Sequence, residues 1–388
     1  MASIEATKKR SRGEDNEETM DKPALKKQLL EGKSALDLIL PISSITKELS
    51  DEDFRIITGT YERILYGINA YWENADDDSS SKPSLKLEPI FIVPAHTGCI
   101  RTVAIGGHFL ASGSADEIIR LYDVKKRKEY GSLGGHHQGD VTDIKFHGKY
   151  MFSTSDDGTI CLWRTKDWEF LKTLKGHKGR INSLAIHPSG RIALSVSSDR
   201  TVILWNLMSA KKASMTKLYR DEGLVVLWNT DGTKYAIMFD RKINVYNVSD
   251  AQVMTTIEHK SKFLCMRYFE SSDKKEYIIS GHEDKTIRIW EAETGKCVVE
   301  IVGHKFRIKT METVKSKPSS ESEPVTVLIT ASSDGVIKCW DVEAAIAAAE
   351  SPEDITPLGE YNTKSRITCC TVHSGYAKST GEVTVSEK

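Results

Sequence analysis

A polar turn followed by a short apolar run recurs along most of the chain. The segments SADEIIRLYD, SDDGTICLW, SSDRTVILW, HEDKTIRIW and SSDGVIKCW each place an Asp six residues before an aromatic residue. The pairs are Asp116 and Tyr122, Asp157 and Trp163, Asp199 and Trp205, Asp284 and Trp290, and Asp334 and Trp340. With a weaker copy at Asp240 and Tyr246, successive aromatic positions lie 41 to 50 residues apart. Self-similarity at a fixed period of this length indicates a repeat architecture, in which each copy forms one supersecondary unit.

Each copy is preceded by two further polar positions. A His stands four residues before an apolar residue, and a Ser or Thr stands four residues before the Asp. These sets resemble the structural tetrad of WD repeats, in which imidazole, hydroxyl, carboxylate and indole satisfy one another inside a blade. We predict structural tetrads in blades 3, 4, 6 and 7: His137, Ser153, Asp157, Trp163; His177, Ser195, Asp199, Trp205; His259, Ser280, Asp284, Trp290; and His304, Thr330, Asp334, Trp340.

Two blades depart from this pattern. Blade 2 has His96, Ser112 and Asp116 but carries Tyr122 in place of Trp. Blade 5 has Tyr219 and Ala236 in place of the His and the Ser. Because a fully satisfied polar network rigidifies a core, blade 5 is expected to be the loosest.

The ends of the chain are expected to meet in blade 1. Residues 54–60, 63–72 and 85–93 are predicted as its second, third and outer strands, with a weak repeat copy at Glu62 and Ile68. No inner strand precedes residue 54, and the apolar run 366–372 follows a complete blade 7. A propeller protects its sheet edges by closing into a ring. We therefore predict an all-β, seven-bladed WD-repeat β-propeller over residues 53–373, closed by a C-terminal strand.

The segments outside the ring differ from it in composition. Residues 1–52 form a charged N-terminal extension that is predicted to be largely disordered, and residues 374–388 a short C-terminal tail. Within the extension, Ala24 to Pro41 places Leu25, Leu29, Leu36 and Ile39 at near-helical spacing. This run indicates either a short helix in a disordered tail or a partner-binding helix, and Gly32 interrupts it.

Bulk composition narrows the class of protein. Hydrophobic residues make up 39% of the chain and charged residues 28%, and the net charge is −1, which argues against a surface devoted wholly to nucleic acid. The seven Cys form no Cys-x-x-Cys, so neither a disulfide framework nor a zinc ribbon is indicated. The N-terminus lacks the apolar core of a secretory signal, and no apolar run approaches the ~20 residues of a membrane helix. A reducing compartment, without a membrane partner, is expected.

Two sets of turns stand out. Three long loops, 73–84, 315–324 and 343–356, are predicted on one side of the ring in adjacent blades. The turns on the opposite side are rich in cations over blades 4 to 7, and they form a candidate partner-binding basic face: Lys178, Arg180, Arg200, Arg241, Lys260, Lys262, Lys285, Lys305 and Arg307. Clustered cations are the footprint of an acidic or RNA partner, although turns of this kind are commonly just solvated.

Several segments resemble one family of WD-repeat proteins. TGTYERILYGI at 58–68, GSADEIIRLYDVKKRKEYGSL at 113–133, KDWEFLKTLKGHKGRIN at 166–182 and AIHPSGRIALSVSSDRTVILWNLM at 185–208 are similar to the p21-activated-kinase-interacting-protein-like family, with its yeast killer-maintenance member. The resemblance spans roughly 54–372. It implies a nucleolar factor for assembly of the large (60S) ribosomal subunit and, in animals, a negative regulator of p21-activated kinase. A nuclear import signal is expected from KKRSR at 8–12 and from Lys26 and Lys27.

Three functions are weighed. The first is a nucleolar scaffold that binds pre-60S assembly factors, ribosomal-like proteins or rRNA during rRNA processing. The second is an inhibitor that binds the regulatory region of a p21-activated kinase. The third is an enzyme, which the sequence disfavours because it contains no G-x-S-x-G, no phosphate-binding Gly loop and no H-E-x-x-H. No catalytic residue, cofactor, metal or small-molecule substrate is expected, and the repeated His and Asp are assigned structural roles.

Overall fold

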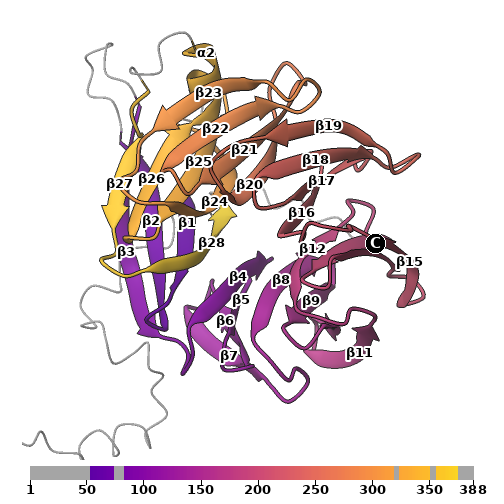
Figure 1. The fold of residues 1–388 in the computed structure, drawn as a ribbon. Helices are drawn as coiled ribbons and strands as arrows, with labels where there is room; N and C mark the ends of the chain where they lie inside the picture. The colour runs from indigo at the N-terminus through magenta and orange to yellow at the C-terminus, as the bar shows by residue number, and fades with distance from the viewer. Residues whose placement is uncertain (1–52, 74–82, 319–322, 350–354, 375–388) are drawn as a thin grey trace, which may run out of the picture.

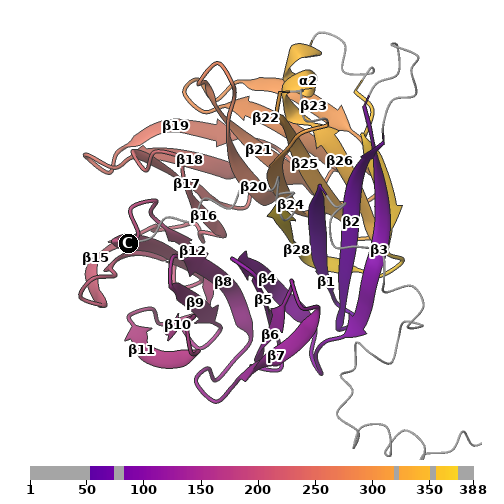
Figure 2. The same cartoon turned by 180° about the vertical axis from the view of Figure 1, so that it is seen from behind.

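The fold is described here from a computed structural model, which describes residues 53–73, 83–318, 323–349 and 355–374. These residues form seven four-stranded antiparallel sheets, arranged as the blades of a ring (Figure 1, Figure 2). The predicted all-β propeller is therefore confirmed. The N-terminal extension, with its run from Ala24 to Pro41, and the tail after Ser374 lie outside the described residues.

Blades 2 to 7 each run from an inner strand to an outer strand in chain order. Blade 2 consists of β4 (Ile100–Gly106), β5 (Phe109–Ser114), β6 (Ile119–Asp123) and β7 (Lys128–Leu133); blade 3 of β8 (Val141–His147), β9 (Tyr150–Ser155), β10 (Thr159–Arg164) and β11 (Glu169–Lys175); and blade 4 of β12 (Ile181–Ile186), β13 (Ile192–Ser197), β14 (Thr201–Asn206) and β15 (Lys211–Lys217).

The second half of the ring repeats this order. Blade 5 consists of β16 (Val225–Trp228), β17 (Lys234–Met238), β18 (Lys242–Asn247) and β19 (Val253–Glu258); blade 6 of β20 (Phe263–Glu270), β21 (Glu276–His282), β22 (Thr286–Glu291) and β23 (Cys297–Val302); and blade 7 of β24 (Ile308–Ser316), β25 (Val325–Ser332), β26 (Val336–Asp341) and β27 (Gly359–Asn362).

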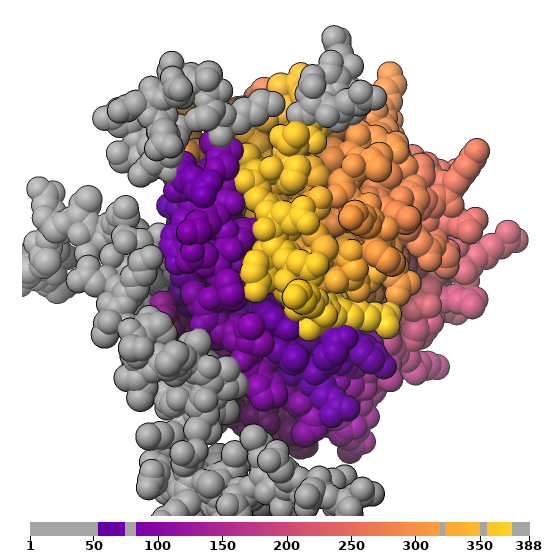
Figure 3. All heavy atoms as spheres, turned by 90° about the vertical axis from the view of Figure 1, so that its left-hand side faces the viewer, coloured from indigo at the N-terminus to yellow at the C-terminus, as the bar shows by residue number. Residues whose placement is uncertain are grey.

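Blade 1 joins the two ends of the described chain. Its inner strand is β28 (Ile367–Ser374), followed by β1 (Phe54–Thr60), β2 (Ile64–Glu73) and β3 (Ser84–Pro94). β28 pairs antiparallel with β1 from Phe54 opposite Ser374 to Thr60 opposite Ile367. Figure 3 shows the yellow C-terminal segment lying between the indigo N-terminal strands and the orange strands of the preceding blades. The predicted closure by a C-terminal strand is confirmed, because β28 occupies the edge that β1 would otherwise expose.

The hydrophobic core is divided among the interfaces between blades. At the closure, Phe54, Ile56 and Ile68 of blade 1 pack with Val327 and Ile337 of blade 7, and all five side chains are fully buried. Further clusters of this kind lie around the ring, so both faces of a sheet are covered by its neighbours. Successive side chains along a strand point to opposite faces of the sheet, and each face packs against a neighbouring blade.

A short helix, α2 (Val342–Ala347), follows the third strand of blade 7 and was not predicted. Asp341 caps it, since its carboxylate accepts a hydrogen bond from the amide of Ala344 at 3.0 Å. Val342 and Ala345 are buried against blades 6 and 7. The Asp followed by an alanine-rich run was the signal for this helix, because Asp is a favoured N-cap and Ala the best helix former.

Candidate interaction surfaces

The polar clusters inside the blades show what supports the surface turns. In blade 4 the hydroxyl of Ser195 lies 2.7 Å from Nε2 of His177 and accepts a hydrogen bond from the indole N–H of Trp205 at 2.8 Å. Nδ1 of His177 is 3.1 Å from the carboxylate of Asp199, which also accepts the amide N–H of Lys178 at 2.8 Å. The carboxylate therefore fixes the turn that carries Lys178, and it is fixed in turn by the buried imidazole.

Blade 3 has the same arrangement with one longer contact. The Ser153 hydroxyl is 2.8 Å from His137 and accepts from the indole of Trp163 at 3.0 Å, while the carboxylate of Asp157 lies 3.6 Å from His137. In blade 2, His96 contacts Ser112 at 2.7 Å and Asp116 at 3.0 Å. Tyr122 fills the Trp position, and burial raises the pKa of its hydroxyl to about 12.

In blade 6 the prediction that His259 belongs to the tetrad is wrong. The structure places His282, not His259, on the hydroxyl of Ser280, at 2.8 Å, and Trp290 donates to the same hydroxyl at 2.7 Å. The carboxylate of Asp284 forms an ion pair with the guanidinium of Arg288 at 3.0 Å. His259 stays in the turn, where its Nδ1 accepts from the amide of Ser261 at 3.0 Å.

In blade 7 the predicted set is present but one link is missing. Thr330 lies 2.8 Å from Nε2 of His304 and accepts from Trp340 at 2.9 Å. The carboxylate of Asp334 accepts from the Ser332 hydroxyl and from the amide of Val336 instead of from the imidazole. Nδ1 of His304 has no hydrogen-bond partner among the described residues.

The five imidazoles that contact a cluster hydroxyl are neutral at physiological pH: His96, His137, His177, His282 and His304. Burial, opposed in part by the neighbouring Asp, lowers the pKa of His96, His137 and His177. Burial, followed by the charge of Arg288, lowers the pKa of His282 to about 3, and burial, followed by Lys338, lowers that of His304 to about 4. A neutral imidazole that donates from Nδ1 and accepts at Nε2 fits the contacts to the carboxylate and the hydroxyl.

The nine residues of the basic face lie in turns on one side of the ring, which we call the upper side. Eight of them are exposed and Lys262 is half-buried. Three have carboxylate partners: Arg180 lies 3.9 Å from Asp156, and Lys262 and Arg241 lie 3.1 and 4.0 Å from Asp240. Six have no ion pair within the described part of the chain: Lys178, Arg200, Lys260, Lys285, Lys305 and Arg307. These six cations are available to an anionic partner.

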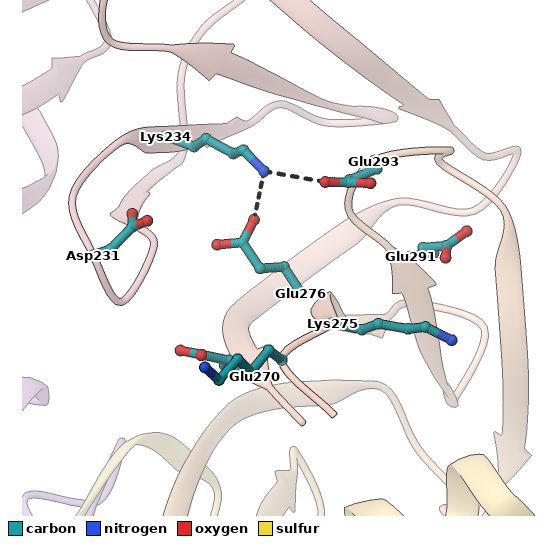
Figure 4. A pocket seen from close by; sticks show the side chains of 8 residues that line it. Asp231, Lys234, Glu270, Lys275, Glu276, Glu291 and Glu293 are labelled. Carbon is teal, nitrogen blue, oxygen red and sulfur yellow. Dashed lines mark hydrogen bonds and ion pairs between the residues drawn. The ribbon is translucent and has the colours of Figure 1, made fainter. Parts of the chain in front are cut away.

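The opposite, lower side carries a pocket of a different charge. It has a volume of about 320 Å³ between blades 5 and 6, and its lining contains five carboxylates and three lysines: Asp231, Lys234, Glu270, Lys274, Lys275, Glu276, Glu291 and Glu293 (Figure 4). Lys234 reaches across it to Glu276 at 2.8 Å and to Glu293 at 3.6 Å. Partial burial lowers the pKa of Lys234, but these two carboxylates outweigh it and leave the pKa raised. The pocket is thus bridged by an ion pair that joins two blades.

The bases of the three predicted long loops lie together on this lower side. The indole of Trp72, at the end of β2, donates to the hydroxyl of Ser316, at the end of β24, at 2.9 Å. The amide of Leu85 donates to the carbonyl of Leu358 at 2.7 Å, which joins the start of β3 to the start of β27. Residues 74–82, 319–322 and 350–354 of these loops lie outside the described residues.

No group of three or more His, Cys, Asp or Glu that would hold a metal ion occurs within 53–73, 83–318, 323–349 and 355–374. None of the helices in these same ranges is long and apolar enough to cross a membrane. Burial raises the pKa of the thiols of Cys161, Cys265, Cys339 and Cys370, so these cysteines are neutral core residues.

Seven blades, five of them built around these clusters, define a WD-repeat propeller, a class that typically serves as a non-catalytic scaffold for interactions. The repeat described as WD domain, G-beta repeat matches residues 87–123, 127–164, 168–206, 251–291 and 295–341. The chain belongs to the WD-repeat family of p21-activated protein kinase-interacting protein 1 and yeast MAK11.

Three relatives illustrate how far the similarity extends. The chain is 36% identical over 333 residues to a p21-activated protein kinase-interacting protein 1-like protein of Danio rerio, covering 85% of this chain and 84% of that one. It is 32% identical over 360 residues to Protein MAK11 of Saccharomyces cerevisiae, covering 82% and 83%. It is 33% identical over 317 residues to p21-activated protein kinase-interacting protein 1 of Homo sapiens, covering 81% and 76%. The family assignment thus rests on most of each protein.

Proposed function

We propose that this protein is an assembly scaffold for the large ribosomal subunit in the nucleolus, and that it holds a pre-ribosomal protein or rRNA on its basic face. The observation that carries the proposal is the set of six exposed, unpaired cations on the upper side of a chain whose net charge is only −1. Cations gathered on one face attract an anionic partner and give an affinity that weakens with salt. Ribosomal precursors supply such partners.

Support for this surface also comes from its rigidity. Lys178 and Arg200 flank Asp199, which the buried imidazole of His177 holds in place. Side chains presented from a fixed turn lose less conformational freedom on binding than side chains on a mobile loop. The basic face is therefore preorganised as well as charged.

The test reverses three of the unpaired cations together, as Lys178→Glu, Arg200→Glu and Lys260→Glu. A tagged full chain is expressed in cells of its own species and sedimented on a sucrose gradient. We expect the variant to lose co-migration with large-subunit precursors, and the wild-type association to weaken from low to moderate salt. The fold should persist, because surface substitutions cost within about 0.5 kcal/mol each.

The matched control reverses three exposed lysines away from the basic face, as Lys125→Glu, Lys172→Glu and Lys211→Glu. It carries the same change in net charge and should co-migrate as the wild type does. Normal co-migration of the basic-face variant would show that these cations are only a solvated surface. Equal loss in both variants would assign the effect to total charge.

A second candidate function is negative regulation of a p21-activated kinase through its regulatory region. The observation that favours it is that relatives carry the names p21-activated protein kinase-interacting protein 1 and Shk1 kinase-binding protein 15. Binding of the purified full chain to a purified kinase regulatory segment tests it directly. Saturable binding with inhibition of the kinase, together with no precursor association on the gradient, would favour this function over the first.

A further inference from the structure

The inner strands share an irregularity at the upper mouth of the central channel. In six of the seven blades the pairing of the inner strand with its neighbour shifts by one residue at the same place. The extra residues, in order from blade 1 to blade 7 and omitting blade 5, are Thr368, Arg101, Thr142, Asn182, Leu264 and Lys309. A β-bulge redirects the side chain of its extra residue, so these positions form a ring at the channel mouth.

Most polar members of this ring reach the following blade. The guanidinium of Arg101 binds Asp140 of blade 3 at 2.9 Å. The amide of Asn182 donates to Glu222 at 2.7 Å and to the carbonyl of Gly223 at 2.9 Å, both at the entry to blade 5. The hydroxyl of Thr368 donates to the carbonyl of Ile100 in blade 2 at 2.6 Å. This position therefore ties neighbouring blades together.

Lys309 departs from that pattern. It is the extra residue of the bulge in β24, it is exposed, and its side chain has no ion pair or hydrogen bond within the described residues. The flanks of a blade are packed against its neighbours, so an exposed side chain on an innermost strand opens on the channel or its mouth. Partial enclosure by the surrounding protein lowers the pKa of Lys309, and the charges of Arg307, Arg101 and Arg366 lower it further.

The neighbours of Lys309 are cationic and aromatic. Arg307 has no ion pair in the described structure, and the guanidinium of Arg366 lies 5.2 Å from the centre of the Tyr61 ring. Arg307 and Arg366 line a hollow of about 510 Å³ with Lys285, Phe306, Ser333, Glu283 and Asp334. Phe306 is 53% exposed and Tyr61 55% exposed. Like charges held close together repel one another, and an anion placed among them would relieve that repulsion.

We propose that this channel mouth binds an acidic peptide segment of a partner protein. A carboxylate of the peptide lies between Lys309, Arg307 and Arg366, and an adjacent apolar or aromatic side chain packs on Phe306. The proposal rests on the proposed function in that it names the chemistry of a partner bound on the upper side. It shares Arg307 and Lys285 with the basic face and adds three residues that the basic face does not include: Lys309, Arg366 and Tyr61.

The arrangement of charge favours a peptide over a nucleic acid. Glu283 and Asp334 line the same hollow as the cations, and Asp140 already neutralises Arg101. A nucleic-acid strand carries a negative charge at every phosphate and would meet these carboxylates. A peptide places its acidic residues on the cations and neutral residues beside Glu283 and Asp334. Aromatic residues and Arg are also the usual anchors of protein interfaces.

The test selects short random peptides on the immobilised full-length protein. The affinities of the selected peptides are then measured by fluorescence polarisation for the wild type, Lys309→Gln and Lys315→Gln. Lys315 is the matched control, because it is an exposed lysine at the other end of the same strand. We expect peptides in which Asp or Glu adjoins Phe or Leu. Lys309→Gln should weaken them about tenfold or more, while Lys315→Gln leaves them unchanged.

Three results would overturn the proposal: selected peptides without acidic residues, no selected peptides at all, or acidic peptides that bind Lys309→Gln as they bind the wild type. Equal melting temperatures of the two lysine variants confirm that both are folded. An oligouridylate that binds with the same dependence on Lys309, where acidic peptides fail, would identify the occupant as nucleic acid.

The sucrose gradient separates this proposal from the previous one. If Lys309→Gln abolishes peptide binding and no variant changes co-migration with precursors, the peptide site stands and the ribosomal function fails. If the basic-face variant loses co-migration while Lys309→Gln binds acidic peptides normally, the ribosomal function stands and the peptide site fails.

Discussion

At the scale of single residues, the buried histidines make the stability of the ring depend on pH. The pKa of His282 is about 3 and that of His304 about 4 in the folded chain, both below the ordinary value. Between the unfolded and folded pKa values the unfolded chain binds protons that the folded chain does not. The contribution of the two histidines to the free energy of unfolding is therefore complete above roughly pH 6.5, and it decreases as the pH falls toward 4.

We expect the free energy of unfolding to fall from pH 7 to pH 5 by about 2 kcal/mol for each of these two histidines. Urea unfolding at both pH values measures it. His304→Gln should remove about that amount of the pH dependence, whatever its effect on stability at pH 7. Asp284, whose pKa is lowered to about 2, does not contribute in this interval, because its stabilisation is lost only at more acidic pH. An unchanged pH dependence in His304→Gln would contradict the assignment.

Residue identity within the clusters was only partly predictable. The Ser or Thr, the Asp and the Trp lie on two paired strands and the turn between them, so their spacing in sequence is fixed by the hairpin. The His comes from a different turn. Which His contacts the hydroxyl therefore depends on the side chains that the fold brings close to it. In blade 6, Arg288 binds Asp284 and His282 stands two residues after Ser280, and these two features of the segment SGHEDKTIRIW were the signal that was missed.

The carboxylates that pair with cations of the basic face could likewise not be predicted from the sequence. Arg180 pairs with Asp156, and Lys262 with Asp240, in each case across two neighbouring blades. Nothing in the linear pattern of charges shows that these two turns meet, whereas the ring brings each such pair together. A cross-blade ion pair of the same kind joins Arg101 to Asp140, whereas Lys309 has no ion pair within the described residues.

At the scale of elements, β28 is the strand on which closure depends. The segment is short and follows a complete blade, and the sequence placed it correctly because only one blade lacked an inner strand. Its register with β1 is continuous from Phe54 to Gly59, and Ile367 is fully buried among Phe54, Val327 and Cys339. β28 therefore covers both an edge and a core.

We expect a chain that ends at Thr363 to be insoluble or protease-sensitive, because it exposes the edge of β1. A chain that ends at Ser374 is the matched control and should melt like the full protein, since it keeps all of β28. If the shorter chain cannot be purified, Ile367→Ala supplies the measurement, with an expected loss of about 2–5 kcal/mol in urea unfolding. A stable chain ending at Thr363, or an unaffected Ile367→Ala protein, would contradict closure through β28.

At the scale of the whole molecule, two blades of the ring, blades 1 and 5, lack the common polar cluster, and blade 5 lies between two blades that have it. Tyr219 takes the His position in blade 5 and is 85% exposed, and Ala236 removes the hydroxyl. Other contacts take their place. Tyr235 and Tyr246 stack at 4.9 Å, Trp228 donates to the carbonyl of Ala185 in blade 4, and Lys234 pairs with Glu276 in blade 6. Blade 5 is thus held mainly by its neighbours.

This difference predicts where the ring opens most easily. A blade that depends on its neighbours loses protection when they move, whereas the cluster in blade 4 stabilises that blade from within. In native-state hydrogen exchange, the amides of β17 and β18 should therefore exchange with a lower opening free energy than those of β13 and β14.

Asp199→Ala leaves the imidazole of His177 and nearby amides without their acceptor, at about 1–3 kcal/mol for each unpaired group. That variant should bring the exchange of blade 4 down toward that of blade 5 while β9 and β10 in blade 3 keep theirs. Equal protection of blades 4 and 5 in the wild type would show that the stacked tyrosines and the Lys234 ion pair replace the missing cluster completely.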